Sequence, residues 1–222
     1  MTRTAVTVLS VLAVVTTLST TASASADTDA HGSSRGDGGH VIAGPRNASG
    51  GASVTGSGEF VLPYYKDDDV RSFTFDAASA PFSKPLPGIP TGLPTDARGT
   101  VKVLHYGADQ HITVTAEGHV DCLVTGPNTA TLTAVIDKVS PGGPDWVGKR
   151  LGFSVYDGGK DKGHSRDRVG FSWDQTMNLM PGGTTEAPEG EVGTCMAPAP
   201  NAPVTKGGYT VRHAELPPFP TP

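Results

Sequence analysis

The segment from Asp157 to Asp167 holds the residues best suited to chemistry in this sequence. Asp157, Asp161 and Asp167 supply three carboxylates, and the three glycines between them let the chain wrap around an ion. Carboxylate and carbonyl oxygens are the ligands that Ca²⁺ takes, although the spacing matches neither an EF-hand loop nor a glycine-rich calcium repeat. Basic side chains also neutralise the acids: Lys160, Lys162, Arg166 and Arg168. The segment therefore predicts a calcium site or, alternatively, an inert polar hairpin tip.

Two other sets of polar residues resemble metal or acid–base sites. His105, His111 and His119 lie on neighbouring predicted strands and could converge on zinc, but no H-x-H or H-E-x-x-H spacing supports such a site. The acidic run 67–69 could supply the paired carboxylates of a glycosidase, yet contiguous acids on a turn are usually solvated. Neither set predicts a catalytic centre.

The candidate nucleophiles are serines and cysteines. Ser154 and Ser172 each lie in a Gly-Phe-Ser string without the G-x-S-x-G elbow of a hydrolase, so strand alternation places them on a solvent face. Cys122 and Cys195 are the two cysteines of the chain, and two cysteines in an exported protein usually form a bridge. We expect a Cys122–Cys195 disulfide, with two free thiols or an intermolecular link as the alternatives. No catalytic residue is predicted.

Short strands must position these side chains. Runs in which large apolar residues alternate with polar ones predict strands with one buried face, at 73–75, 101–103, 112–116, 120–124, 130–136 and 208–214. The 29 glycines and 19 prolines oppose long helices and supply turns between the runs. The sequence predicts an all-β fold, an antiparallel β-sandwich of the jelly-roll or immunoglobulin-like kind with long Pro/Gly-rich loops.

Two further runs share one pattern and predict a hairpin. In 151–155 and 169–173 large apolar residues stand at alternate positions, so each run turns one apolar face to the core. Gly152 and Gly170 then lie on the opposite face, where they leave room for the close approach of another segment. The connection 157–167 is too long for a tight turn and is expected to be exposed, and mobile unless something orders it.

Two segments are expected to be irregular. Residues 77–98 carry five prolines and predict an extended surface loop, and residues 174–203 are similar in composition. Cys195 lies inside the second segment, whereas Cys122 lies on a predicted strand. A disulfide between them would hold that loop against the sheet.

Several motifs occur in an order that resembles a known family. These are VDCLVTG at 120–126, KRLGFSVYDGGKD followed by DRVGFSW within 149–173, a lone cysteine, and GGYTV at 207–211. In these motifs the chain is similar to the exported proteins of Gram-positive bacteria often labelled repetin. The resemblance covers about residues 58–214 and implies a signal peptide, a disordered leader and one β-rich domain. It implies no activity and no catalytic residue. The loop after Asp157 and the segment 77–98 are longer than the family's usual pattern.

The N-terminal residues predict export. Arg3 precedes an apolar stretch at 5–18, which is shorter than the ~20 residues of a membrane span, and Ala24-Ser25-Ala26 is a small-x-small cleavage site. An uncleaved anchor is the alternative. No second apolar stretch is long enough to span a membrane. The predicted organisation is a signal peptide at 1–26, a disordered leader at 27–52, a β-sandwich domain at 53–215 and a Pro-rich tail at 216–222.

Charge and composition narrow the function only in part. The formal net charge is −5 and the basic residues are scattered, so a nucleic-acid partner is not expected. We expect a secreted, extracellular, non-enzymatic β-domain that binds an extracellular partner or a cell-envelope component. A hydrolase acting on an extracellular polymer, or an inhibitor of a secreted enzyme, is the alternative. A cleft with converging, pKa-perturbed groups would favour the hydrolase.

Overall fold

The computed structural model describes residues 51–173, 177–182 and 188–221, and in these residues all regular secondary structure is strand. The signal peptide predicted at 1–26, and the leader as far as residue 50, lie outside the described residues. No helix of the described part is long and apolar enough to cross a membrane. The strands are β1 (Ser53–Phe60), β2 (Val70–Ser79), β3 (Ala97–Gly107), β4 (Ile112–Gly126), β5 (Thr129–Val139), β6 (Arg150–Tyr156), β7 (Lys160–Asp161), β8 (His164–Ser165), β9 (Arg168–Phe171) and β10 (Ala202–Arg212).

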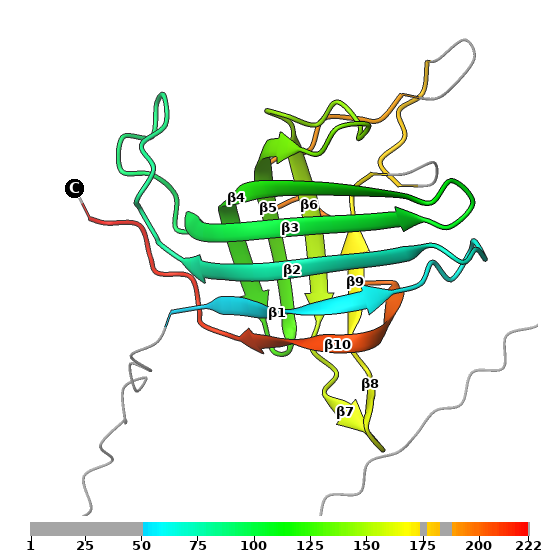
Figure 1. Ribbon diagram of the computed structural model, residues 1–222. Coiled ribbons are helices and arrows are strands. Elements are labelled where there is room, and N and C mark those ends of the chain that lie inside the picture. Colours follow the sequence, from blue (N-terminus) through cyan, green and yellow to red (C-terminus); the bar gives the residue numbers. More distant parts are fainter. Residues whose placement is uncertain (1–50, 174–176, 183–187, 222) are drawn as a thin grey trace, which may run out of the picture. The chain divides into compact units, whose positions relative to one another are not determined.

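Eight of these strands close into an antiparallel barrel, in the order β1-β10-β9-β6-β5-β4-β3-β2 (Figure 1). The predicted β-sandwich is therefore wrong, although the all-β class is right. Sandwich and barrel strands show the same alternation of buried and exposed residues, so the alternation cannot separate them. The difference lies in β1, which pairs with β2 on one side and with β10 on the other and so leaves no open edge.

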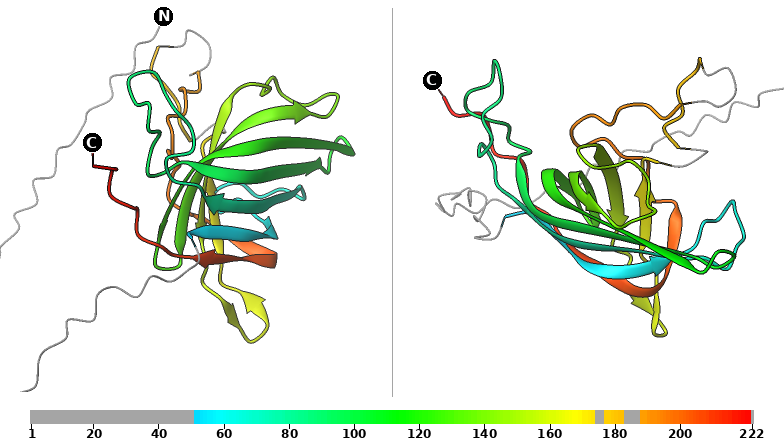
Figure 2. Two further views of the ribbon diagram at one scale, coloured as in Figure 1. Left: turned by 90° about the vertical axis from the view of Figure 1, so that its left-hand side faces the viewer. Right: turned by 45° about the horizontal axis from the view of Figure 1, so that its top comes forward.

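Local irregularities give the sheet the curvature that closure requires. The register between β4 and β5 shifts twice, at Glu117/Gly118 and at Val120/Cys122, and the register between β1 and β10 shifts once, at Glu59/Phe60. Bulges of this kind bend a strand and increase its twist. The views in Figure 2 show the long strands β2 to β4 curving around the interior.

The predicted hairpin is confirmed. β6 and β9 are antiparallel neighbours in which Phe153 faces Phe171 and Val155 faces Val169. All four of these side chains are buried. The Phe153 ring lies 5.2 Å from that of Phe73, which connects this hairpin to the opposite wall of the barrel. Interlocked aromatic rings of this kind fill the middle of the interior.

The predicted close approach at the two glycines is also confirmed. The segment 192–200 passes over the outer face of β6 and β9, with the carbonyl of Met196 against Gly152 and that of Ala199 against Gly170. A β-carbon at either glycine would collide with these carbonyls. The predicted Cys122–Cys195 disulfide is present, with its Cα atoms 5.4 Å apart, and attaches this segment to β4. We call residues 192–200 the strap.

The first irregular segment is shorter than predicted, and the second ends earlier in the chain. β2 extends to Ser79 and β3 begins at Ala97, so the proline-rich loop covers only 80–96. This loop is held at Asp96, whose buried carboxylate accepts hydrogen bonds from the backbone N–H groups of Lys84 at 2.8 Å and Leu93 at 3.1 Å. The second segment ends earlier as well, because β10 begins at Ala202.

Candidate functional site

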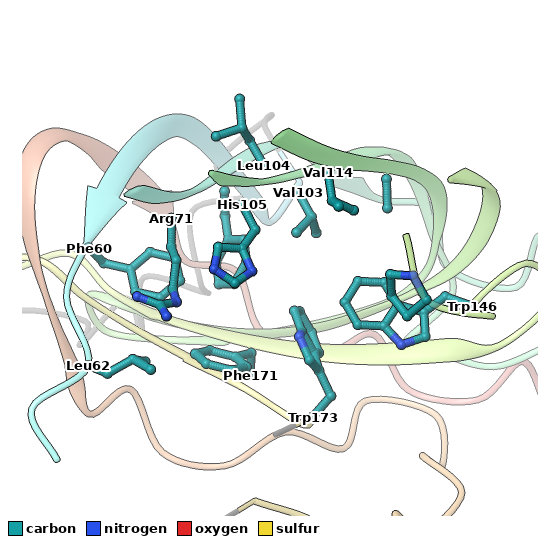
Figure 3. A pocket seen from close by; sticks show the side chains of 13 residues that line it. Phe60, Leu62, Arg71, Val103, Leu104, His105, Val114, Trp146, Phe171 and Trp173 are labelled. Carbon is teal, nitrogen blue, oxygen red and sulfur yellow. The ribbon is translucent and has the colours of Figure 1, made fainter. Parts of the chain in front are cut away.

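One mouth of the barrel holds an apolar pocket of about 290 Å³ (Figure 3). Its wall combines aromatic and aliphatic side chains, among them Phe60, Phe73, Trp146, Phe171, Trp173, Leu62, Val103 and Val114. The strands supply this lining because alternate residues point inward. The register places Phe75 opposite Val101, one step further from this mouth than the Phe73–Val103 pair. The fully buried rings of Phe75 and Phe153 fill the interior there. The pocket is thus a blind cup at one end of a packed barrel.

Two tryptophans form one wall of the cup. Trp173 follows β9, and its ring lies 4.8 Å from Phe171 and 5.2 Å from Phe153. Trp146 comes from the β5–β6 connection and meets Trp173 edge to face at 5.2 Å. A hydrogen bond from the backbone N–H of Lys149 to the Trp146 carbonyl, at 2.8 Å, holds this connection in place. The hairpin pattern predicted that Trp173 packs in the core, and the structure shows it only partly buried, on the pocket wall.

A charged cluster lies at one corner of the same mouth. Arg71 donates to both carboxylate oxygens of Asp67, at 2.9 and 2.6 Å, and to Asp69 at 3.0 Å. His105 Nε2 lies 2.7 Å from the same oxygen of Asp69, whose other oxygen accepts the backbone N–H of Ala108 at 2.9 Å. The acidic run 67–69 is therefore more than the solvated turn that its sequence suggested, because two of its three members are engaged.

The contacts in this cluster keep both carboxylates ionised. The hydrogen bond from Arg71 lowers the pKa of Asp67, and its positive charge adds to this. The N–H of Ala108 lowers the pKa of Asp69, followed by the hydrogen bond to His105. Hydrogen bonds to the charged form favour that form. The pocket thus combines an apolar wall with one polar corner whose charges are largely paired.

The three candidate calcium ligands do not form a cluster. The buried carboxylate of Asp167 accepts backbone N–H groups of Gly158 at 3.0 Å and Tyr209 at 2.7 Å, and Asp157 accepts that of Val211 at 3.0 Å. Asp161 lies exposed on β7, at the tip of the ribbon that β7 and β8 form. Within the described residues no three His, Cys, Asp or Glu side chains are grouped to hold a metal ion. The calcium site remains a prediction.

Asp157 and Asp167 instead have a visible structural role. β10 pairs with β9 only at Ala202 and Pro203, so further along β10 the ladder to β9 is missing. The two carboxylates accept N–H groups of β10 in that stretch and so take the place of a neighbouring strand. They also order the 157–167 connection, which we expected from the sequence to be mobile unless something ordered it.

We expect Asp167→Asn to lower the free energy of unfolding by about 2–3 kcal/mol. The amide keeps the shape of the side chain, but its nitrogen cannot accept, so one buried N–H loses its partner. Asp161→Asn is the matched control, because Asp161 is exposed, and it should change stability by less than about 0.5 kcal/mol. Urea denaturation measures both. Equal effects of the two variants would contradict the role of Asp167 in closing the barrel. A melting temperature that falls in Asp161→Asn only when calcium is present would establish the calcium site.

The other candidate residues lie apart from one another. His105 lies in the mouth, His119 pairs with Asp137 at 2.8 Å, and the Tyr106 hydroxyl lies 2.9 Å from His111. The three histidines therefore have separate partners and do not converge. The two serines that were expected on a solvent face are in fact buried beneath the strap. Ser154 donates to the Pro198 carbonyl at 2.6 Å, and Ser172 accepts the N–H of Gly152 at 2.9 Å.

Comparison with known proteins gives no assignment. No protein-family model, curated protein or solved structure matches the chain. The resemblance to the repetin-labelled proteins remains an expectation from sequence motifs. The disulfide is compatible with an extracellular protein, since such bridges persist in oxidising compartments. The pocket in the barrel mouth is thus the observation that bears most directly on function.

Proposed function

We propose that the protein is a secreted binding protein that holds a small apolar molecule in the mouth of its barrel. The observation that carries this proposal is the blind, aromatic-lined cup. Ligand sites are concave, mostly apolar, and carry a few placed polar groups, which describes this mouth. The predicted signal peptide and the disulfide support the extracellular location.

The size of the cup limits the ligand. Its volume of about 290 Å³ lies just below the range of about 300–1,000 Å³ that is typical of small-molecule pockets. A molecule with one or two rings, or a short acyl chain, fits this space. A two-ring hydrocarbon that loses roughly 250 Å² of apolar surface gains at most about 6 kcal/mol. The expected dissociation constant is therefore on the order of tens of micromolar or weaker.

The charged corner supports binding over catalysis. The alternative of a hydrolase predicted a cleft with converging, pKa-perturbed groups, and the mouth does gather Asp67, Asp69 and His105. However, the pKa values of both carboxylates are lowered and their oxygens are already engaged. A general acid or base near neutral pH needs the opposite shift for a carboxyl group. This corner is better suited to hold fixed charges at the edge of a pocket.

Naphthalene is expected to bind saturably and to change the intrinsic fluorescence of the protein. The chain has two tryptophans, and both line the pocket, so the signal reports on this site. Val114→Phe places a ring in the cup and should weaken binding about tenfold or more, since it occupies the space of the ligand. Val70→Phe on β2 is the matched control, because Val70 is exposed and does not line the pocket, and it should bind like the wild type. The absence of a saturable response in the wild type would contradict the proposal.

A further inference from the structure

We infer that the ligand of the mouth is a neutral ring carrying a hydroxyl or N–H group that donates a hydrogen bond to His105. This inference rests on the proposed function and adds the polar chemistry of the ligand. Two observations support it: His105 lines the apolar cup, and its imidazole is paired with Asp69.

His105 belongs to the inner face of the barrel. On β3 it follows Val101 and Val103 at alternate positions, so its side chain turns to the same side, one step nearer the rim. Figure 3 shows its imidazole beside Arg71, reaching into the space that Phe171 and Trp173 border. The side chain is 46% exposed, so a ligand in the cup can reach it.

Asp69 determines which nitrogen of His105 carries the proton. An ionised carboxylate only accepts hydrogen bonds, and the contacts of Asp69 keep it ionised. His105 Nε2 must therefore be the donor across the 2.7 Å that separates it from Asp69. In the neutral imidazole the other nitrogen, Nδ1, is then an acceptor. Among the described residues none is hydrogen-bonded to Nδ1, which leaves it available to a donor on the ligand.

The charges of the corner favour a neutral ligand. The Arg71 guanidinium is already paired with two carboxylates, those of Asp67 and Asp69. With a neutral His105 the cluster carries one net negative charge, from two carboxylates and one guanidinium. A ligand carboxylate would be repelled and would have to take Arg71 away from partners that it already has. A hydroxyl or N–H group meets Nδ1 without this cost.

Three probes that share one ring system test the inference: naphthalene, 2-naphthol and 2-naphthoate. Calorimetric titration at about pH 8, above the reference pKa of a free imidazole in water, measures the three affinities. We expect 2-naphthol to bind about 3- to 10-fold tighter than naphthalene, the usual net gain from one hydrogen bond, and 2-naphthoate to bind more weakly than 2-naphthol. In His105→Leu the preference for 2-naphthol over naphthalene should disappear.

His119→Leu is the matched control. His119 also pairs with a carboxylate, Asp137 at 2.8 Å, but it lies outside the pocket lining. This variant should keep the preference for 2-naphthol. If His105→Leu loses naphthalene binding as well, His105→Gln decides, because its carbonyl oxygen can still accept: a retained preference supports the inference and a lost one overturns it.

The outcomes separate the two proposals. If naphthalene does not bind the wild type, the proposed function fails. If naphthalene binds but 2-naphthol binds no tighter, or if His105→Leu keeps the preference, the inference is overturned and the proposed function stands. Tightest binding of 2-naphthoate would overturn the inference too, since Arg71 would then be the anchor.

Discussion

Replacement of Phe153 by alanine is expected to lower the free energy of unfolding by about 3–5 kcal/mol, and Phe171→Ala should have a similar effect. Phe153 is fully buried and its ring contacts those of Phe73, Phe75 and Trp173 at 5.2–5.4 Å. Its loss leaves a cavity where the two walls of the barrel meet. A loss of this size is a large part of the 5–15 kcal/mol by which small domains are usually stable, so the variant is expected to be close to unfolding.

Chemical denaturation of the wild type and both variants measures the effect. Phe219→Ala is the matched control, because Phe219 is 58% exposed in the C-terminal tail, where its ring contacts that of Phe82 at 5.7 Å. It should cost less than about 1 kcal/mol. Losses below about 1 kcal/mol at both Phe153 and Phe171 would show that the β6–β9 hairpin is not part of the core.

Local features of the fold could be predicted from the sequence, whereas its closure could not. The alternation in 151–155 and 169–173 is a property of neighbouring residues, and it correctly predicted the hairpin and its buried face. Closure depends on the pairing of β1 with β10, whose residues lie about 150 positions apart. β1 also gives a weak signal, because its sequence SVTGSGEF contains two glycines and few large apolar side chains.

The pocket was missed because its wall comes from many separate segments. Trp146 lies in a loop, and nothing in its neighbourhood in the sequence indicates that it packs against Trp173 in one wall of the mouth. The charged corner could be recognised only from the pairing register of β2 and β3, in which Arg71 and His105 are directly opposite each other. Once this register is known, the run 67–69 just before β2 lies beside a cation and an imidazole and can no longer be treated as a solvated turn.

The calcium hypothesis illustrates a related limit. The residue types of Asp157 and Asp167 suit a cation, and the sequence offers no sign of other partners. Their partners are backbone N–H groups, which every residue except proline carries, so no residue type in the sequence identifies these partners. The role of these carboxylates becomes visible only in the structure, where the ladder between β9 and β10 is missing and they accept the β10 N–H groups that a neighbouring strand would otherwise accept.

Removal of the disulfide, as Cys122→Ala with Cys195→Ala, is expected to lower the free energy of unfolding by roughly 4 kcal/mol. The bridge joins residues 73 positions apart, and closing so long a loop removes much entropy from the unfolded chain. The loss should be accompanied by faster hydrogen exchange in the strap, because the bridge attaches this segment to β4. The β6–β9 hairpin beneath it should stay protected, since its own core contacts remain.

Wild-type protein refolded in the presence of reductant provides a second measurement, free of any cavity that the alanines leave. Both forms should lose stability by similar amounts, and both should still bind naphthalene, because the bridge and the strap lie outside the pocket lining. A loss below about 1 kcal/mol in both forms would mean that the loop is already restrained in the unfolded chain. Loss of naphthalene binding by a folded, reduced protein would instead show that the strap supports the mouth through β6 and β9.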